Sequence, residues 1–160
     1  MKREETTDLV HEDTVRQEWI DYNGHMSEAF YVLVFGHATD DFLDAVGLDS
    51  AYRDKQEVSA YTVEAHIRYL DQARQGDPLH VTTLLTDCDA KRARIFHTMR
   101  LGQEGPVLAT EEVLLLHVDT ARDKVSPFDD TIREKLSVMA SQHGELPRPK
   151  DLGRAINMPG

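Results

Sequence analysis

One stretch of the chain is decisive for its fold: Trp19-Ile20-Asp21-Tyr22-Asn23-Gly24-His25-Met26-Ser27-Glu28-Ala29-Phe30-Tyr31. A segment that we interpret as a strand, residues 10–20, leads into it, although its charge content weakens the strand pattern. The centre, Asp21 to His25, is rich in residues that favour turns, and the end is apolar. The stretch therefore predicts a change from strand to helix through a polar turn.

The apolar end of this stretch begins a long helical pattern. Apolar residues recur at positions 30, 31, 34, 35, 38, 42 and 45, and Gly47 stands where a left-handed C-terminal cap belongs. Residues 30–35 alone equally suit a strand, because Val and aromatic residues favour sheets. A pattern of about 18 residues is too long for a typical strand, so we predict a helix. Its first half is apolar almost all round, which predicts burial.

Four strand-like runs follow the helix, at residues 61–69, 79–86, 93–101 and 107–118. In the first of these, apolar side chains hold the odd positions and polar ones the even positions, which is the pattern of a half-buried strand. Turn-forming sequences at 75–78, 87–91 and 102–106 separate the runs. Short turns between such runs predict an antiparallel meander.

A second helix is predicted after the strands. Ser126 is a suitable N-cap, Pro127 a suitable first residue, and Asp129 an acid in the first turn. The apolar face of this helix would consist of Phe128, Ile132, Leu136 and Met139. We interpret residues 143–160 as a C-terminal tail, poorly ordered unless it docks on a partner subunit. The length of 160 residues suits one domain, 1–160.

The composition argues against several kinds of partner and location. Eighteen Lys and Arg against 29 Asp and Glu give a net charge of -11, which disfavours nucleic acid. A local basic cluster still suits a phosphorylated group, because salt screens charges beyond roughly 8–10 Å. Cys88 is the single cysteine, so no intramolecular disulfide forms, and we interpret it as a small buried hydrophobe. With no signal-peptide pattern and no apolar run of membrane-spanning length, we expect a cytoplasmic protein and no membrane partner.

The quoted stretch resembles the D-x-x-G-H-[MV]-[NS]-x-x-x-Y signature of hotdog-fold thioesterases of the 4-hydroxybenzoyl-CoA thioesterase type. Arg68-Tyr69 followed by Gly76-Asp77 resembles the next landmark of that family. The resemblance implies an α+β hotdog fold, in which a curled antiparallel sheet wraps around a long central helix. It also implies hydrolysis of an acyl-CoA thioester, with Asp21 as nucleophile or as general base toward water.

A carboxylate at this turn suits thioester hydrolysis, which needs an attacking oxygen and a stabilised oxyanion. Asp21 supplies the first, and backbone N–H groups at the start of a helix from Met26 to Val46 supply the second. Gly24 allows close backbone approach to a substrate carbonyl, and His25 orients the turn or donates a hydrogen bond. The alternative is a capping turn without catalysis. The candidate catalytic residues are Asp21, Gly24, His25 and Met26.

Other candidates lie on the helix and on the strand predicted at 61–69. Tyr31 resembles the helix tyrosine of the family, although a large aromatic on a buried helix is often part of the core. Glu64 and His66 occupy the polar face of the strand, which in a hotdog dimer can line the site; a solvated face explains them equally well.

Basic residues gather at the turn between the second and third strand-like runs. Lys91, Arg92 and Arg94 form the one compact basic cluster and suit CoA phosphates, with a charged turn as the alternative. His37 with Asp40 and Asp41 has helical spacing but no second ligand pair, so we expect no metal site. We expect no cofactor either, since CoA enters as part of the substrate.

A narrower resemblance concerns the acyl group. The quoted stretch, the 61–69 strand and the terminal Leu146-Pro147-Arg148-Pro149 are similar to betainyl-CoA thioesterases of bacterial carnitine degradation, which implies release of glycine betaine and CoA. A quaternary ammonium group cannot donate hydrogen bonds, so its site uses aromatic faces and carboxylates. The available side chains are Trp19, Tyr22, Tyr61 and Glu64.

Two alternatives remain open: a hotdog enzyme for another short or aromatic acyl-CoA, and a hotdog protein that only binds its ligand. In each case one sheet on one helix leaves an open edge that a second subunit can cover. We therefore expect a homodimer or a homotetramer.

Overall fold

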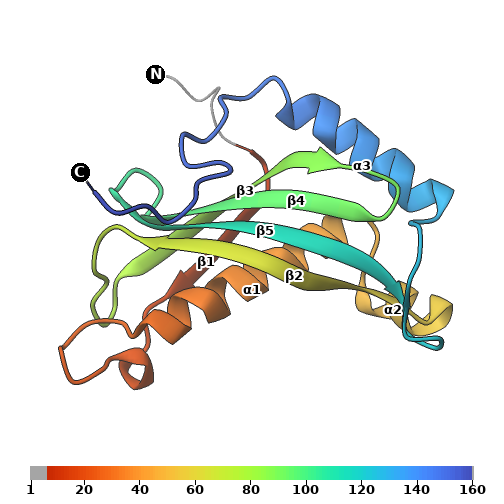
Figure 1. Cartoon of the computed structure of the whole chain (residues 1–160). Helices are drawn as coiled ribbons and strands as arrows, with labels where there is room; N and C mark the ends of the chain where they lie inside the picture. Colours follow the sequence, from red (N-terminus) through yellow and green to blue (C-terminus); the bar gives the residue numbers. More distant parts are fainter. Residues whose placement is uncertain (1–6, 160) are drawn as a thin grey trace.

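A curled sheet packed on one long helix dominates the computed structural model of the chain, which describes residues 7–159 (Figure 1). α1 lies along one face of the sheet, and α3 lies beside β3 (Figure 1). In chain order the elements are β1 (Val10–Thr14), the 3-10 turn η1 (Gln17–Trp19), α1 (Glu28–Ala45), α2 (Ser50–Gln56), β2 (Val58–Tyr69), β3 (Pro78–Cys88), β4 (Arg92–Leu101), β5 (Val107–Asp119), β6 (Lys124–Val125) and α3 (Asp130–His143). The predicted α+β hotdog fold is confirmed. None of these helices, within residues 7–159, combines the length and apolar content of a membrane span.

The strands are antiparallel and run in the order β1-β3-β4-β5-β2, with β6 added beside β5. The predicted meander is confirmed for β3, β4 and β5, but β2 pairs with β5 rather than with its successor β3. The connection from Leu70 to Asp77 makes this crossing possible. Eight residues reach up to roughly 26 Å, which exceeds the roughly 15 Å across three strand spacings.

The first strand is shorter than predicted. β1 ends at Thr14, and the following residues leave the sheet. The Val15 N–H donates to Asp77 O (3.0 Å) and the Gly76 N–H donates to Val15 O (2.9 Å), so the chain pairs with the turn before β3. It then enters η1, which buries Trp19. The apolar residues at the end of the predicted strand are therefore buried through a turn outside the sheet.

α1 confirms the long central helix. Gly47 has the predicted left-handed conformation at its C-terminal end, with a φ of 90°. The buried side chains include Tyr31, Val34, Phe35, Ala38 and Phe42. Burial all round the first half is wrong, however, because Val32 and Leu33 are each 42% exposed. One side of α1 packs on the sheet, and the other side carries an uncovered apolar stripe.

α3 begins later than predicted. Its N-cap is Asp129, whose side chain accepts the Ile132 N–H at 2.9 Å. Ser126 instead lies after β6, where its backbone oxygen is 2.9 Å from the Nδ1 atom of His117. The predicted apolar face is present, with Phe128, Ile132 and Leu136 buried in the core. Sequence analysis did not predict α2, which Asp49 caps through a 2.8 Å bond from the Tyr52 N–H.

β2 contains an irregularity that breaks the predicted alternation. The register with β5 shifts between Thr62 and Glu64, so Val63 is an extra residue, a β-bulge. Tyr61 is 47% exposed and Val63 is 51% exposed, although both occupy odd positions. Ile67, after the bulge, packs against the core. The expectation that odd positions are buried is therefore wrong before the bulge, because the bulge changes which parity faces α1.

The two edges of the sheet differ. Along β3, the Thr83 N–H donates to Leu9 O (3.0 Å) and the Leu85 N–H donates to the Nδ1 atom of His143 (2.9 Å), so β1, its preceding residues and α3 cover this edge. The outer edges of β1 and β2 have no strand beside them among residues 7–159. The open edge expected from sequence therefore occurs on both sides, and the β2 edge is the longer, with 12 residues against 5 in β1.

Two ionisable side chains lie in the layer between the sheet and α1. His97 is fully buried, and its ring nitrogens lie 2.9 Å from Thr39 Oγ1 and 2.8 Å from Thr83 Oγ1. Burial lowers the pKa of His97 to about 3. Glu111 is opposite His97 in the β4–β5 register, and burial raises its pKa to about 7. This layer therefore favours uncharged side chains.

Candidate active site

The predicted catalytic turn is held together by main-chain hydrogen bonds. Ile20 and Met26 form an isolated β-bridge, and inside it the Asp21 N–H donates to His25 O at 3.0 Å. The Gly24 N–H donates to Asp21 O at 3.0 Å, and Gly24 has a φ of 80°, a conformation that glycine adopts readily. We call residues 20–26 the Asp21 turn. Its geometry depends on local backbone contacts more than on packing.

The Asp21 carboxylate is half-buried in this turn. Its Oδ1 atom accepts the Asn23 N–H at 2.8 Å, which fixes the side chain over the turn. Oδ2 has no hydrogen-bond partner among residues 7–159. His25 is half-buried, and its backbone oxygen closes the turn. The turn thus presents one carboxylate oxygen that is able to act as a base or a nucleophile.

The turn is attached to the N-terminus of α1 and to the loop after β2. The Met26 N–H donates to Ala73 O (2.8 Å) and the Ser27 N–H donates to Trp19 O (2.9 Å). The proposed oxyanion donors are therefore corrected: Met26 is not available, and α1 begins only at Glu28. The N–H groups of Glu28 and Ala29, in the first helical turn, have no intrahelical acceptor. They replace Met26 as the candidate donors.

The aromatic residues around the turn have different positions. Tyr22 is 96% exposed, whereas Trp19 is 3% exposed. The Trp19 ring stacks on Phe30, with centroids 5.5 Å apart, and the Arg16 guanidinium carbon lies 5.0 Å from its centroid. In this arrangement the Trp19 ring already has partners and is buried in the core, and its binding of the substrate cation stays a prediction.

Tyr31 supports the turn from the core. It is 3% exposed, and its hydroxyl donates to Asp71 O at 3.2 Å, in the loop whose Ala73 accepts the Met26 N–H. Its ring meets Tyr69 edge-on, with centroids 5.2 Å apart. Burial is the main cause that raises the pKa of Tyr31. Tyr31 is thus placed to position the loop and the turn.

A second candidate region lies on the outer face of the sheet, the face away from α1. A cavity of about 490 Å³ there is in the size range of ligand sites. Pairing between β2, β5 and β4 places Glu64, Leu114 and Arg94 in register across three strands. Side chains in register share a face of the sheet. We call this cavity the outer-face pocket; it is lined by Glu64, His66, Asp87, Cys88, Asp89, Arg92, Arg94, Glu112, Leu114, Gly153 and Arg154.

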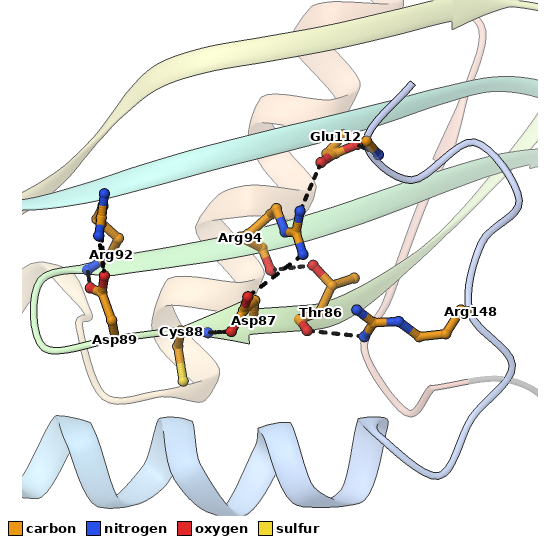
Figure 2. A network of polar contacts seen from close by, with 9 residues as sticks. Thr86, Asp87, Cys88, Asp89, Arg92, Arg94, Glu112 and Arg148 are labelled. Carbon is orange, nitrogen blue, oxygen red and sulfur yellow. Dashed lines mark hydrogen bonds and ion pairs between the residues drawn. The ribbon is translucent and has the colours of Figure 1, made fainter. Parts of the chain in front are cut away.

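The arginines of the outer-face pocket are paired with acids (Figure 2). Arg92 Nε donates to Asp89 Oδ2 at 2.8 Å, and this hydrogen bond is the main cause that lowers the pKa of Asp89 to about 2. Arg94 lies 3.6 Å from Asp87 and 3.7 Å from Glu112. Lys91 is exposed at the adjoining turn. The sequence pattern predicts these cations as a site but not the acids Asp87, Asp89 and Glu112 that pair with them. Glu112 is far from Arg94 in the sequence, and only strand register brings the two together.

The C-terminal tail crosses the same face, where Figure 2 shows Arg148 and Glu112 beside its ribbon. Arg148 Nη1 donates to Thr86 O (3.0 Å), and the Gly153 N–H donates to Glu112 Oε2 (2.6 Å). Asp151 is 7% exposed and lies 2.9 Å from Arg68 Nη1. The tail therefore docks on its own sheet and adds Arg154 to the outer-face pocket.

The two regions do not meet within one chain. In Figure 1, the loop that holds the Asp21 turn lies at the end of the sheet where β2 finishes, and the β3–β4 hairpin with Arg92 lies at the opposite end. Hydrogen bonding agrees, because the Tyr69 hydroxyl, at the end of β2, donates to Glu28 O (3.2 Å) at the start of α1. Tyr61, Glu64 and His66 lie on β2 between these ends.

The family model for the thioesterase-like superfamily matches residues 15–136. The chain belongs to the thioesterase-like superfamily. It is 39% identical over 150 residues to betainyl-CoA thioesterase of Pseudomonas aeruginosa, covering 94% of both chains. It is 42% identical over 147 residues to an L-carnitine dehydrogenase/betainyl-CoA thioesterase of Agrobacterium fabrum, of which it spans only 30%.

A solved structure has a similar fold. A Staphylococcus aureus protein in complex with CoA superposes with a TM-score of 0.88 and 27% sequence identity, over 94% of this chain and 95% of that chain. The predicted resemblance to hotdog thioesterases is confirmed. The individual site residues stay predictions.

Proposed function

We propose that this member of the thioesterase-like superfamily hydrolyses betainyl-CoA to glycine betaine and CoA. The observation that carries the substrate is the 39% identity to a betainyl-CoA thioesterase over 94% of both chains. The Asp21 turn supports the chemistry, since it presents a carboxylate at the N-terminus of α1. Water is the other reactant, so the proposed reaction needs no cofactor beyond the CoA of its substrate.

Each residue of the turn has a proposed role. Asp21 acts as nucleophile on the thioester carbon or as general base that removes a proton from the attacking water. The N–H groups of Glu28 and Ala29 donate to the oxyanion of the tetrahedral intermediate, which collapses with departure of the CoA thiolate. With Asp21 as base the product is glycine betaine directly; with Asp21 as nucleophile it is a mixed anhydride, which water hydrolyses to release glycine betaine and restore the carboxylate. Gly24, without a side chain, leaves room for the substrate carbonyl, since nothing lies within 4 Å of its Cβ position.

The outer-face pocket is the proposed site for the CoA phosphates. Arg92, Arg94 and Arg154 line one cavity together with four carboxylates, and ion pairs with acids hold their guanidinium groups in place. A phosphate group would accept charge-assisted hydrogen bonds from them. Lys91, exposed in the turn just before Arg92, adds a further positive charge.

A second subunit would bring the two regions together. Six large exposed apolar side chains lie on α1, on β2 and just after it: Val32, Leu33, Tyr61, Val63, Tyr69 and Leu70. Two chains that pair through their open β2 edges about a two-fold axis place opposite ends of β2 side by side. The Asp21 turn of one chain then approaches the β3–β4 hairpin end of the partner. We therefore propose a homodimer as the minimal active unit.

Sedimentation of Leu33→Glu tests the dimer. The variant places a charge in the apolar stripe of α1, so we expect a monomer at micromolar concentration with most activity lost. Val138→Glu is the matched control, because Val138 is 53% exposed on α3, outside the stripe. A wild-type protein that sediments only as a monomer, or a dimeric and active Leu33→Glu, would contradict this interface.

The acyl group is tested by comparing kcat/KM for betainyl-CoA with that for 3,3-dimethylbutanoyl-CoA, in which carbon replaces nitrogen. Tyr22 is exposed beside Asp21, while Tyr61 and Glu64 would reach the acyl group only from a second subunit. An aromatic face contributes about 0.5–2 kcal/mol toward a cation, so we expect a preference of roughly 3- to 30-fold. Glu64→Gln should reduce this preference, and Glu134→Gln on α3 is the control.

Each outcome of that comparison is informative. Equal values for the two substrates would eliminate betainyl-CoA and favour the alternative, a thioesterase for another short acyl-CoA. Failure to release thiol from any member of an acyl-CoA panel would instead favour a protein that only binds CoA esters.

A further inference from the structure

Three potential metal ligands meet where β1 packs on α1. His11 and Asp13 are alternate residues of β1 and share one face, and His37 comes from α1. One ligand atom from each residue lies within 4.8 Å of the other two, and all three residues are half-buried. This set lies outside both regions proposed for catalysis. It joins two elements that are far apart in the sequence.

His11 has the arrangement that a metal-binding histidine requires. Its Nδ1 atom lies 2.7 Å from Asp41 Oδ2, so Nδ1–H donates to this carboxylate and leaves a lone pair on Nε2. Nε2 is buried and has no hydrogen-bond partner among residues 7–159. A carboxylate on one ring nitrogen commonly fixes a histidine that binds a metal through the other. A buried nitrogen without a partner is otherwise destabilising.

We propose that His11, Asp13 and His37 bind one divalent transition-metal ion, with His11 coordinating through Nε2 and Asp41 orienting its ring. Two imidazoles and one carboxylate suit Zn²⁺, Co²⁺ or Ni²⁺, whereas Mg²⁺ and Ca²⁺ prefer oxygen ligands. Tetrahedral ligands at about 2.0–2.1 Å lie about 3.4 Å apart, so side-chain shifts of about 1 Å close the site, and water completes it. Asp13 would keep its backbone contact, a 2.8 Å bond from the Thr14 N–H.

The fold brings to His37 the second pair of metal ligands that its neighbours in the sequence do not provide. Sequence analysis expected no metal site because His37, Asp40 and Asp41 lack a second ligand pair. Packing of β1 on α1 supplies His11 and Asp13 as that pair and assigns Asp41 to the His11 ring. The ion would link the edge strand to the central helix and stabilise the fold, with no part in hydrolysis.

The test is titration of the full-length protein, without a histidine tag and treated with EDTA, with Co²⁺ at pH 7.5. We expect visible d–d absorption that saturates at one ion per chain, and a rise in Tm on adding Zn²⁺. His37→Gln and Asp13→Asn should each weaken Co²⁺ binding at least tenfold, and Asp41→Asn about tenfold.

Glu12→Gln is the matched control, since Glu12 lies between His11 and Asp13 on the opposite face of β1 and is mostly exposed. It should bind Co²⁺ like the wild type, and circular dichroism would check that each variant is folded. Absence of saturable Co²⁺ absorption in the wild type overturns the proposal, as does equal weakening by Glu12→Gln and His37→Gln. EDTA should leave thioesterase activity unchanged, so this result is independent of the proposed function.

Discussion

The Asp21 turn and the outer-face pocket are built by different means. Backbone hydrogen bonds within seven residues shape the turn, and two more attach it to α1 and to the loop after β2. Ionic contacts between side chains of β3, β4 and β5, and a hydrogen bond from the Gly153 N–H of the tail to Glu112, shape the pocket. The Asp21 side chain can be changed without altering the backbone of the turn, whereas the arginines of the pocket and their acids hold one another. The turn is therefore suited to chemistry and the pocket to affinity.

Asp21→Asn should have the largest effect, and this effect should fall on the chemistry of the Asp21 turn and not on the affinity of the outer-face pocket. The amide still accepts the Asn23 N–H and keeps the turn, but it is neither a base nor an anionic nucleophile. We expect kcat to fall by about 10²–10⁴-fold with little change in KM. Steady-state kinetics with betainyl-CoA and the CD spectrum measure this. Near-normal kcat in a folded variant would remove Asp21 from its role.

The layer between the sheet and α1, which contains Glu111, should differ from the Asp21 turn and the outer-face pocket in how it makes stability depend on pH. The pKa of Glu111 is raised by burial to about 7, so its contribution to folding is present below its unfolded pKa and is lost as pH rises toward 7. Glu111→Gln should match the wild type below about pH 4.5 and become up to about 3 kcal/mol more stable by pH 8. Urea unfolding at several pH values measures the difference. A variant that gains nothing at pH 8 would contradict the raised pKa.

Arg92→Ala tests whether the pocket contributes affinity alone. Loss of a charge-assisted contact to phosphate should raise KM about tenfold and leave kcat unchanged. Arg122→Ala is the control, because Arg122 pairs with Asp119 at the same i,i+3 spacing as Arg92 with Asp89, but outside the pocket. An equal rise in KM for both variants would mean that only general charge matters.

The smallest expected effect concerns the tail. Asp151→Asn removes the charge that holds Arg68 and Arg154, and a contact of this kind is worth a few tenths to about 1 kcal/mol. We therefore expect KM to rise by about two- to fivefold. Asp119→Asn, which affects the Arg122 pair, serves as the comparison. An unchanged KM would mean that the tail does not contribute to the affinity of the outer-face pocket.

Local and long-range features differ in how well the sequence predicts them. The run from Asp21 to Tyr31 predicts both the turn and α1, because its hydrogen bonds join near neighbours. The acids around Arg94 and the ligand pair for His37 depend on strand register and helix packing, which no local pattern contains. The start of α3 is an intermediate case, since Ser126 and Asp129 are both good caps and a contact of Ser126 with His117 leaves Asp129 as the cap.

The bulge at Val63 is the one place in β2 where the chain can lose a residue without turning its side chains over. Thr62 pairs with Leu115 and Glu64 with Leu114, so without Val63 the two flanks would join as a regular strand, whereas loss of a paired residue would turn one flank over. Single substitutions along the strand alter one contact each, whereas deletion of a paired residue exchanges the two faces of half the strand. Evolution of this protein can therefore vary the chemistry of β2 residue by residue and can lose the codon for Val63, but gene changes that remove a codon at a paired position should be strongly selected against.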